Sequence, residues 1–255
     1  MRYAANLSIL FPDLALLDRP AAAARAGFDA VESWWPFATA TPAATEVDGF
    51  VDAIHAAGVR LIALNFFAGN LAAGDRGIVS WPGREAEFAA GVRIAVDIGA
   101  RLGTTAFNAL YGNRLPNTTG QDDVAVHNLR HAATEAAEIG ATILIEPVSG
   151  VPAYPLLTAA DVVTVIDRVG VDNLALLADV YHLSVNGDDV GKVIDVHYGR
   201  IGHVQIADSP GRHEPGTGQL DLTTWLHALD QRGYPGYTAA EYVPTGIGFD
   251  WMAEL

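Results

Sequence analysis

Short apolar runs alternate with longer alanine-rich stretches along the whole chain. The apolar runs are nearly continuous, as expected for parallel strands that are covered on both faces. They predict eight strands, at about Tyr3–Leu7, Ala30–Ser33, Arg60–Asn65, Thr104–Asn108, Thr142–Glu146, Ala175–Asp179, His203–Ile206 and Tyr237–Glu241.

The stretches between these runs place apolar residues at helical spacing. They predict helices near Pro20–Ala26, Ala43–Ala57, Arg84–Leu102, Asp122–Ile139, Ala159–Val169, Asp189–His197 and Leu222–Arg232. Neither a linker nor a break in composition interrupts the alternation, which favours a closed barrel over an open sheet. We therefore expect an α/β fold, a (β/α)8 TIM barrel, as a single domain over residues 1–255 with a short last helix.

Each predicted strand ends in a polar residue. In chain order these residues are Asn6, Glu32, Asn65, Asn108, Glu146, Asp179, Gln205 and Glu241. Active sites of such barrels are built at the carboxyl ends of the strands, so these side chains are the candidate site. A polar residue at one strand end is often only a turn former or helix cap. Because all eight predicted strands end in one, we favour a role for these residues in an active site.

Four of these residues predict a metal site: Glu146, Asp179, Gln205 and Glu241, from neighbouring strands. Three carboxylates and an amide form an all-oxygen set, which suits Mg²⁺ or Mn²⁺ better than zinc. Without a cation the carboxylates would repel one another, unless arginines or helix starts balance them.

Further candidates for substrate contact lie beside this set. They are Asn65 and Asn108 at earlier strand ends, and His182, which we expect at the start of the loop after the sixth strand. Arg212, in a Gly/Pro-rich loop after the seventh strand, is a candidate for holding an anionic substrate. His203 is expected to be structural.

A long loop follows the third strand, AGNLAAGDRGIVSWPGRE, with Arg76 and Trp81. Loops of this length usually form a lid or a binding surface. We expect it to cover the site.

Composition narrows the classes of function. The 15 basic and 30 acidic residues give a net charge of −15, which disfavours binding to nucleic acid or to membrane surfaces. Cysteine is absent, which excludes thiolate chemistry, and the lone lysine, Lys192, falls in a predicted helix. No signal peptide or membrane span is recognisable, so we expect a cytoplasmic protein that acts on small molecules, with a homo-oligomer as a candidate assembly.

Several motifs resemble the hydroxypyruvate isomerase family of xylose-isomerase-like barrels. They are ANLSILF at the start, AAGDRGI and PGREAEF after the third strand, IEP, ADVYH, GHVQIADSPGRHEPGTG and AAEY. They follow the family's order over almost the whole chain, and the segments after the third and seventh strands are the most specific.

The resemblance implies an isomerase that interconverts hydroxypyruvate and tartronate semialdehyde. It implies that Glu146 and Glu241 are the acid/base pair and that Asp179 and Gln205 join them as metal ligands. Ketose 3-epimerases, which are similar, usually carry histidine where this chain has Gln205, which favours the hydroxypyruvate isomerase branch.

Other functions remain open. A 2-oxo-tetronate isomerase or a ketose 3-epimerase would use the same two glutamates. A metal-dependent hydrolase of the endonuclease type would need a histidine-rich site and a basic groove, and the first four strand ends carry no histidine. A sugar-binding barrel without catalysis is the remaining alternative.

Overall fold

The computed structural model describes all 255 residues and contains a closed barrel of eight parallel strands in sequential order. The barrel closes where β1 pairs with β8. The strands are β1 (Tyr3–Asn6), β2 (Ala30–Ser33), β3 (Arg60–Asn65), β4 (Ala106–Asn108), β5 (Thr142–Ile145), β6 (Leu174–Asp179), β7 (Ile201–Ile206) and β8 (Thr238–Ala240). The predicted (β/α)8 fold is confirmed.

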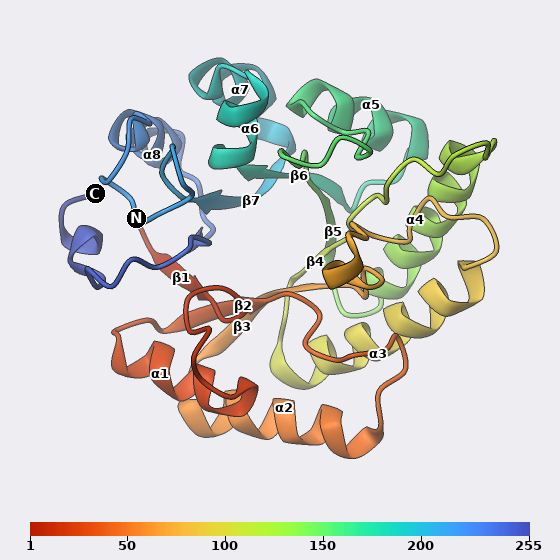
Figure 1. The fold of residues 1–255 in the computed structure, drawn as a ribbon, viewed down its shortest axis with the longest axis horizontal. Helices are drawn as coiled ribbons and strands as arrows, with labels where there is room; N and C mark the ends of the chain where they lie inside the picture. Colours follow the sequence, from red (N-terminus) through yellow and green to blue (C-terminus); the bar gives the residue numbers. More distant parts are fainter.

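Helices surround the strands (Figure 1). They are α1 (Arg19–Arg25), α2 (Ala44–Ala57), α3 (Glu85–Leu102), α4 (Gln121–Ala137), α5 (Ala159–Val169), α6 (Val180–Asn186), α7 (Val190–His197) and α8 (Leu222–Gln231). Short 3-10 helices are η1 (Leu16–Asp18), η2 (Leu71–Ala73), η3 (Tyr198–Arg200) and η4 (Asp250–Ala253). The expected short last helix is the 3-10 helix η4.

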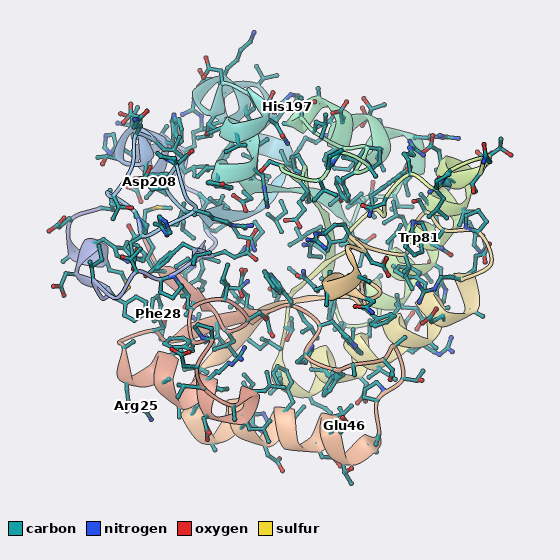
Figure 2. All side chains as sticks on the ribbon, in the orientation of Figure 1. Arg25, Phe28, Glu46, Trp81, His197 and Asp208 are labelled. Carbon is teal, nitrogen blue, oxygen red and sulfur yellow. The ribbon has the colours of Figure 1, made fainter.

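Apolar side chains separate into two compartments on either side of the sheet. The larger one, between the strands and the helices, includes Phe28, whereas Arg25 and Glu46 lie on the outer faces of their helices (Figure 2). Smaller clusters fill the barrel itself: Ala4, Ala30, Tyr237 and Ala239 form one, and Ala63, Ala106, Leu144 and Leu177 the other.

The interior clusters explain why the site residues meet. Successive side chains of a strand point to opposite faces, so residues two apart share a face. Asn6 follows Ala4 by two positions, and Asp179 follows Leu177 in the same way. The strand-end polar residues therefore point into the barrel, one layer above its apolar filling.

Helix α6 corrects one prediction. The segment after Asp179 was expected to be a loop, but a helix begins directly at Val180. Asp179 accounts for the difference, since its Oδ1 accepts hydrogen bonds from the amides of Tyr181 (2.8 Å) and His182 (3.2 Å) and caps the helix. His182 thus lies in the first turn of a helix.

No helix in the structure combines the length and apolar character needed to cross a membrane.

Candidate active site

Four predicted residues gather at the carboxyl ends of β5 to β8. Asp179 ends β6 and is directly opposite Gln205 on β7. Glu146 and Glu241 each follow the last residue of their strand, β5 and β8. All four side chains are buried, so the charges of the three carboxylates interact through a medium that screens poorly.

Arg212 lies between two of these carboxylates. Its Nη2 donates to Asp179 Oδ2 at 2.9 Å and to Glu241 Oε2 at 2.7 Å, and its Nε donates to the Glu241 carbonyl at 3.1 Å. Burial by itself would lower the pKa of Arg212, but the carboxylates of Glu241 and Asp179 raise it above the ordinary value. The guanidinium therefore stays charged and supplies positive charge inside the acidic ring.

Both candidate catalytic glutamates hold their protons more tightly than free glutamate. Burial, reinforced by the neighbouring Asp179, raises the pKa of Glu146 to about 8, against a smaller lowering by Asn108. Burial also raises the pKa of Glu241 well above its ordinary value, and Arg212 opposes this rise. Carboxyl groups with raised pKa values suit proton transfer near neutral pH.

A hydrogen-bond network centred on Glu32 holds the remaining ligand candidate. Glu32 Oε1 accepts from Gln205 Nε2 at 2.7 Å and from Asn6 Nδ2 at 2.8 Å, and Glu32 Oε2 is 2.6 Å from His203 Nε2. Asn6 Nδ2 also donates to Glu241 Oε1 at 3.1 Å. The network fixes which end of the Gln205 amide carries oxygen, and it pairs His203 with Glu32 outside the cavity lining.

His182 is buried and neutral at physiological pH. Burial lowers its pKa to about 4. The amide of Ser149 donates to Nδ1 at 3.0 Å, so the ring proton is assigned to Nε2, which lies 3.6 Å from Asp179 Oδ2. This arrangement offers a neutral N–H beside the acidic ring.

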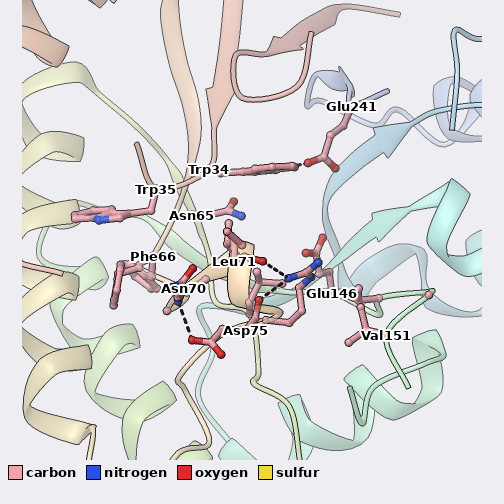
Figure 3. A pocket seen from close by; sticks show the side chains of 18 of the residues that line it. Trp34, Trp35, Asn65, Phe66, Asn70, Leu71, Asp75, Glu146, Val151 and Glu241 are labelled. Atoms are coloured by element: carbon pink, nitrogen blue, oxygen red, sulfur yellow. Dashed lines mark hydrogen bonds between the residues drawn. The ribbon is translucent and has the colours of Figure 1, made fainter. Parts of the chain in front are cut away.

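A cavity of about 1010 Å³ opens onto four of these groups, whereas Asp179 and Gln205 are not part of its lining. Glu146, Glu241, Arg212 and His182 line it, together with aromatic side chains from the β2–α2 and β3–α3 connections. Trp34 points its ring at Glu241, and its Nε1 donates to Glu241 Oε1 (Figure 3). No periodic pattern in the sequence predicts this contact, because Trp34 lies in a loop.

The two asparagine candidates are placed differently. Asn65 is half-buried and lines the cavity. Asn108 is buried beside Glu146 outside the cavity lining, where its hydrogen bond lowers the pKa of that glutamate. The long β3–α3 loop lines the cavity through Asn70, Asp75 and Arg76, as expected for a binding loop.

The donor set suits a hard divalent cation. Gln205 Oε1 is a buried oxygen without any hydrogen-bond donor, and Asp179 and Glu241 already direct one oxygen each at a shared positive group. Carboxylate and amide oxygens are the ligands that Mg²⁺ and Mn²⁺ prefer. No three acidic or histidine side chains are arranged as a complete metal-binding group, and Arg212 lies between Asp179 and Glu241.

A barrel with paired buried carboxyl groups at the carboxyl ends of its strands, next to a large cavity, defines a TIM-barrel enzyme. The model of the xylose isomerase-like TIM barrel family matches residues 20–255. A Streptomyces coelicolor protein with a provisional hydroxypyruvate isomerase name is 48% identical, over 98% of this chain and 95% of its own. The chain belongs to the hydroxypyruvate isomerase family of xylose isomerase-like TIM barrels.

Two further relatives show the range of this family. A 2-oxo-tetronate isomerase from Cupriavidus necator is 35% identical, over 98% of this chain and 97% of its own. A crystal structure described as an AP endonuclease, family 2, from Brucella melitensis superposes with a TM-score of 0.90 at 32% identity, covering 99% of this chain and 98% of that chain.

Proposed function

We propose that this protein interconverts hydroxypyruvate and tartronate semialdehyde by moving a proton between adjacent carbons. The observation that carries this proposal is the convergence of Glu146 and Glu241, both buried and both with raised pKa values, on one cavity. Such a reaction needs one group to remove a carbon-bound proton and another to return one. The activity named for relatives at 48% and 35% identity is of the same type.

In the proposed reaction one glutamate, as the carboxylate, removes a proton from C3 of hydroxypyruvate, and an enediolate forms between C2 and C3. The other glutamate, as the acid, delivers a proton to C2, and the hydroxyl proton of O3 passes to O2. The aldehyde then stands at C3 and the hydroxyl at C2, so atoms and charge balance. The two glutamates thereby exchange protonation states.

The other residues hold the reacting groups. Arg212 keeps Asp179 and Glu241 in place through Nη2, and its Nη1, which makes no hydrogen bond in the protein, would donate to substrate oxygens in the cavity that Arg212 lines. We propose that His182 and Asn65 also contact the substrate and that Asn108 acts through Glu146.

We propose that Glu146, Asp179, Gln205 and Glu241 hold Mg²⁺ or Mn²⁺. The cation would supply positive charge that stabilises the developing enediolate oxygens. The orphaned Gln205 Oε1 supports this assignment. The cytoplasmic location and homo-oligomeric state expected from the sequence stay predictions.

A second candidate, a 2-oxo-tetronate isomerase, would use the same groups on a four-carbon acid. The cavity favours it, because about 1010 Å³ lies at the upper end of the roughly 300–1,000 Å³ typical of ligand pockets.

The test is a substrate comparison in ²H₂O, with the protein first treated with chelator and then reloaded with Mg²⁺ or Mn²⁺. Hydroxypyruvate and a 2-oxo-tetronate are supplied separately, and NMR follows both product formation and deuterium uptake at the reacting carbons. The proposal expects isomer formation with exchange in the reloaded protein. Absence of both with each acid would contradict it.

A further inference from the structure

The cavity contains one positive charge without an acidic partner. Three arginines line it: Arg76, Arg84 and Arg212. Arg212 is paired with Asp179 and Glu241, and Arg84 makes a two-pronged contact with Glu87, at 2.6 and 2.8 Å. Arg76 has no carboxylate within 4.0 Å, although the chain carries twice as many acidic as basic residues.

The side chain of Arg76 is also oriented by the protein. Its Nη1 donates to the carbonyl of Leu71 at 3.1 Å and to that of Asp75 at 2.7 Å, and Figure 3 shows these carbonyls at the cavity wall. Its Nε and Nη2 make no hydrogen bond in the protein. The Nε–Nη2 edge of a guanidinium is a fork that matches the two oxygens of a carboxylate.

The loop that carries Arg76 is fixed on both sides. Asp75 Oδ2 accepts from the amide of Asn70 at 2.7 Å. On the other side Gly77, with φ of +102°, packs so closely on Leu110 that a Cβ would lie 1.8 Å from its carbonyl oxygen. An arginine between two such fixed neighbours loses little conformational entropy when it binds an anion.

The other two arginines of the cavity are already engaged. Arg212 donates to Asp179 and Glu241, and Arg84 donates to Glu87. A substrate carboxylate that enters the cavity needs a charged partner of its own, because burying an unpaired charge is costly. Arg76 is the lining arginine with a free edge for it.

We propose that Arg76 binds the carboxylate of the substrate and so makes the enzyme selective for 2-oxo acids over uncharged sugars. This inference rests on the proposed function and adds the substrate class that the site selects. Arg212 then serves the reacting end of the substrate, and Arg76 the end that does not react.

The test uses two inert probes of matched size. Glycerate and glycerol differ in a carboxylate against a hydroxymethyl group, and neither has a carbonyl to isomerise. Binding of each to the full-length, Mn²⁺-loaded protein is followed by ligand-detected NMR. We expect Arg76→Gln to weaken glycerate binding at least about tenfold, as for loss of a charged hydrogen bond, and to leave glycerol binding unchanged.

Two variants control the result. Arg84→Gln removes an arginine of the same cavity that is already paired, so glycerate binding should change less than about threefold. Arg76→Lys keeps the charge but loses the two-pronged edge, so it should weaken glycerate binding by an intermediate amount. Should Arg76→Gln fail to fold, the lysine variant alone decides the question through the same comparison of the two probes.

Equal effects of an Arg76 substitution on glycerate and glycerol, or equal effects of Arg76→Gln and Arg84→Gln on glycerate, would overturn the inference. Because neither probe is turned over, the result does not depend on isomerase activity. Selective loss of glycerate binding together with a wild-type protein that fails to isomerise any 2-oxo acid would contradict the proposed function alone.

Discussion

Glu241 has more polar contacts than the other candidate catalytic residue. One oxygen accepts from Asn6 and Trp34, and the other accepts from Arg212. These contacts come from β1, the β2–α2 connection and the β7–α8 connection. A carboxylate held in this way is oriented before substrate arrives, and orientation is a large part of what an enzyme contributes to a proton transfer.

Replacing Glu241 with glutamine should therefore remove catalysis without unfolding the protein. General acid–base catalysis typically contributes about 10²–10⁴-fold, so we expect Glu241→Gln to lower kcat by at least about 100-fold. Deuterium exchange at the substrate carbon should be lost in parallel. Glu138→Gln, at an exposed glutamate, is the matched control. Near-normal turnover and exchange in Glu241→Gln would instead point to His182.

The raised pKa of Glu146 predicts how stability depends on pH in protein treated with chelator. Its pKa is about 8 in the folded state against an ordinary value of 4.5. A raised pKa contributes stability that is complete below the ordinary value and is lost as pH rises through the folded value. Urea unfolding should therefore show decreasing stability between about pH 5 and 8.5.

Two further measurements test whether Glu146 causes this decrease of stability with pH. Glu146→Gln should flatten it, because the glutamine does not ionise. Saturating Mn²⁺ at pH 8 should raise stability, by about 2.7 kcal/mol when its concentration is 100 times the Kd. A slope that is the same in wild type and Glu146→Gln would show that other groups cause it.

Sequence order was sufficient to predict the ring of polar residues but not their partners. The two-residue period of a strand makes Glu146, Asp179, Gln205 and Glu241 point inward once the fold is known. The contact of Arg212 with Asp179 and Glu241 depends on a loop in which Arg212 has φ of +56°. Such backbone conformations follow from tertiary packing, and no periodic pattern encodes them.

At the scale of whole elements, the β3–α3 connection is held by side-chain hydrogen bonds to a neighbouring connection. Asn113 Nδ2 donates to the carbonyl of Gly74 at 2.9 Å, and Trp81 Nε1 donates to the carbonyl of Asn113 at 2.8 Å. These bonds join the loop to the β4–α4 connection. The strands and most helices were predicted to within one or two residues, whereas α6 was missed because Asp179 ends a strand and starts a helix at once.

Adding a methyl group to this loop should have a local and measurable cost. Gly77→Ala places a Cβ against Leu110 and forces a positive φ on alanine, so we expect a loss of at least about 1 kcal/mol in unfolding free energy. The KM for a 2-oxo acid should rise as well, since Arg76 is the preceding residue.

Gly49 provides the comparison. It lies inside α2, and a Cβ there would meet only Leu17 Cδ1, at 3.7 Å. Gly49→Ala should therefore stabilise the protein by about 0.5–1 kcal/mol and leave KM unchanged. Equal urea midpoints for the two variants would contradict the close packing described for Gly77.

The molecule as a whole is strongly acidic, with a net charge of −15. Although the Brucella melitensis structure is described as an AP endonuclease, phosphate backbones would be repelled by such a surface. We expect no retention of duplex DNA containing an abasic site at about 0.1 M salt in a gel-shift assay, and no strand cleavage with Mg²⁺, Mn²⁺ or Zn²⁺. Cleavage of the DNA by the wild-type protein but not by Glu241→Gln would instead support a metal-dependent hydrolase of the endonuclease type.

The hydrogen bonds that join the β3–α3 loop to the β4–α4 connection also affect which step limits the rate of turnover. In many enzymes a covering loop opens and closes within microseconds to milliseconds, and that motion limits turnover. Here the loop is fastened at Gly74, Gly77 and Trp81, so its amides should show no relaxation dispersion in NMR. Substrate would then enter and leave by diffusion through a cavity that stays open. The proton transfers at carbon, rather than a loop motion, would limit the rate of turnover.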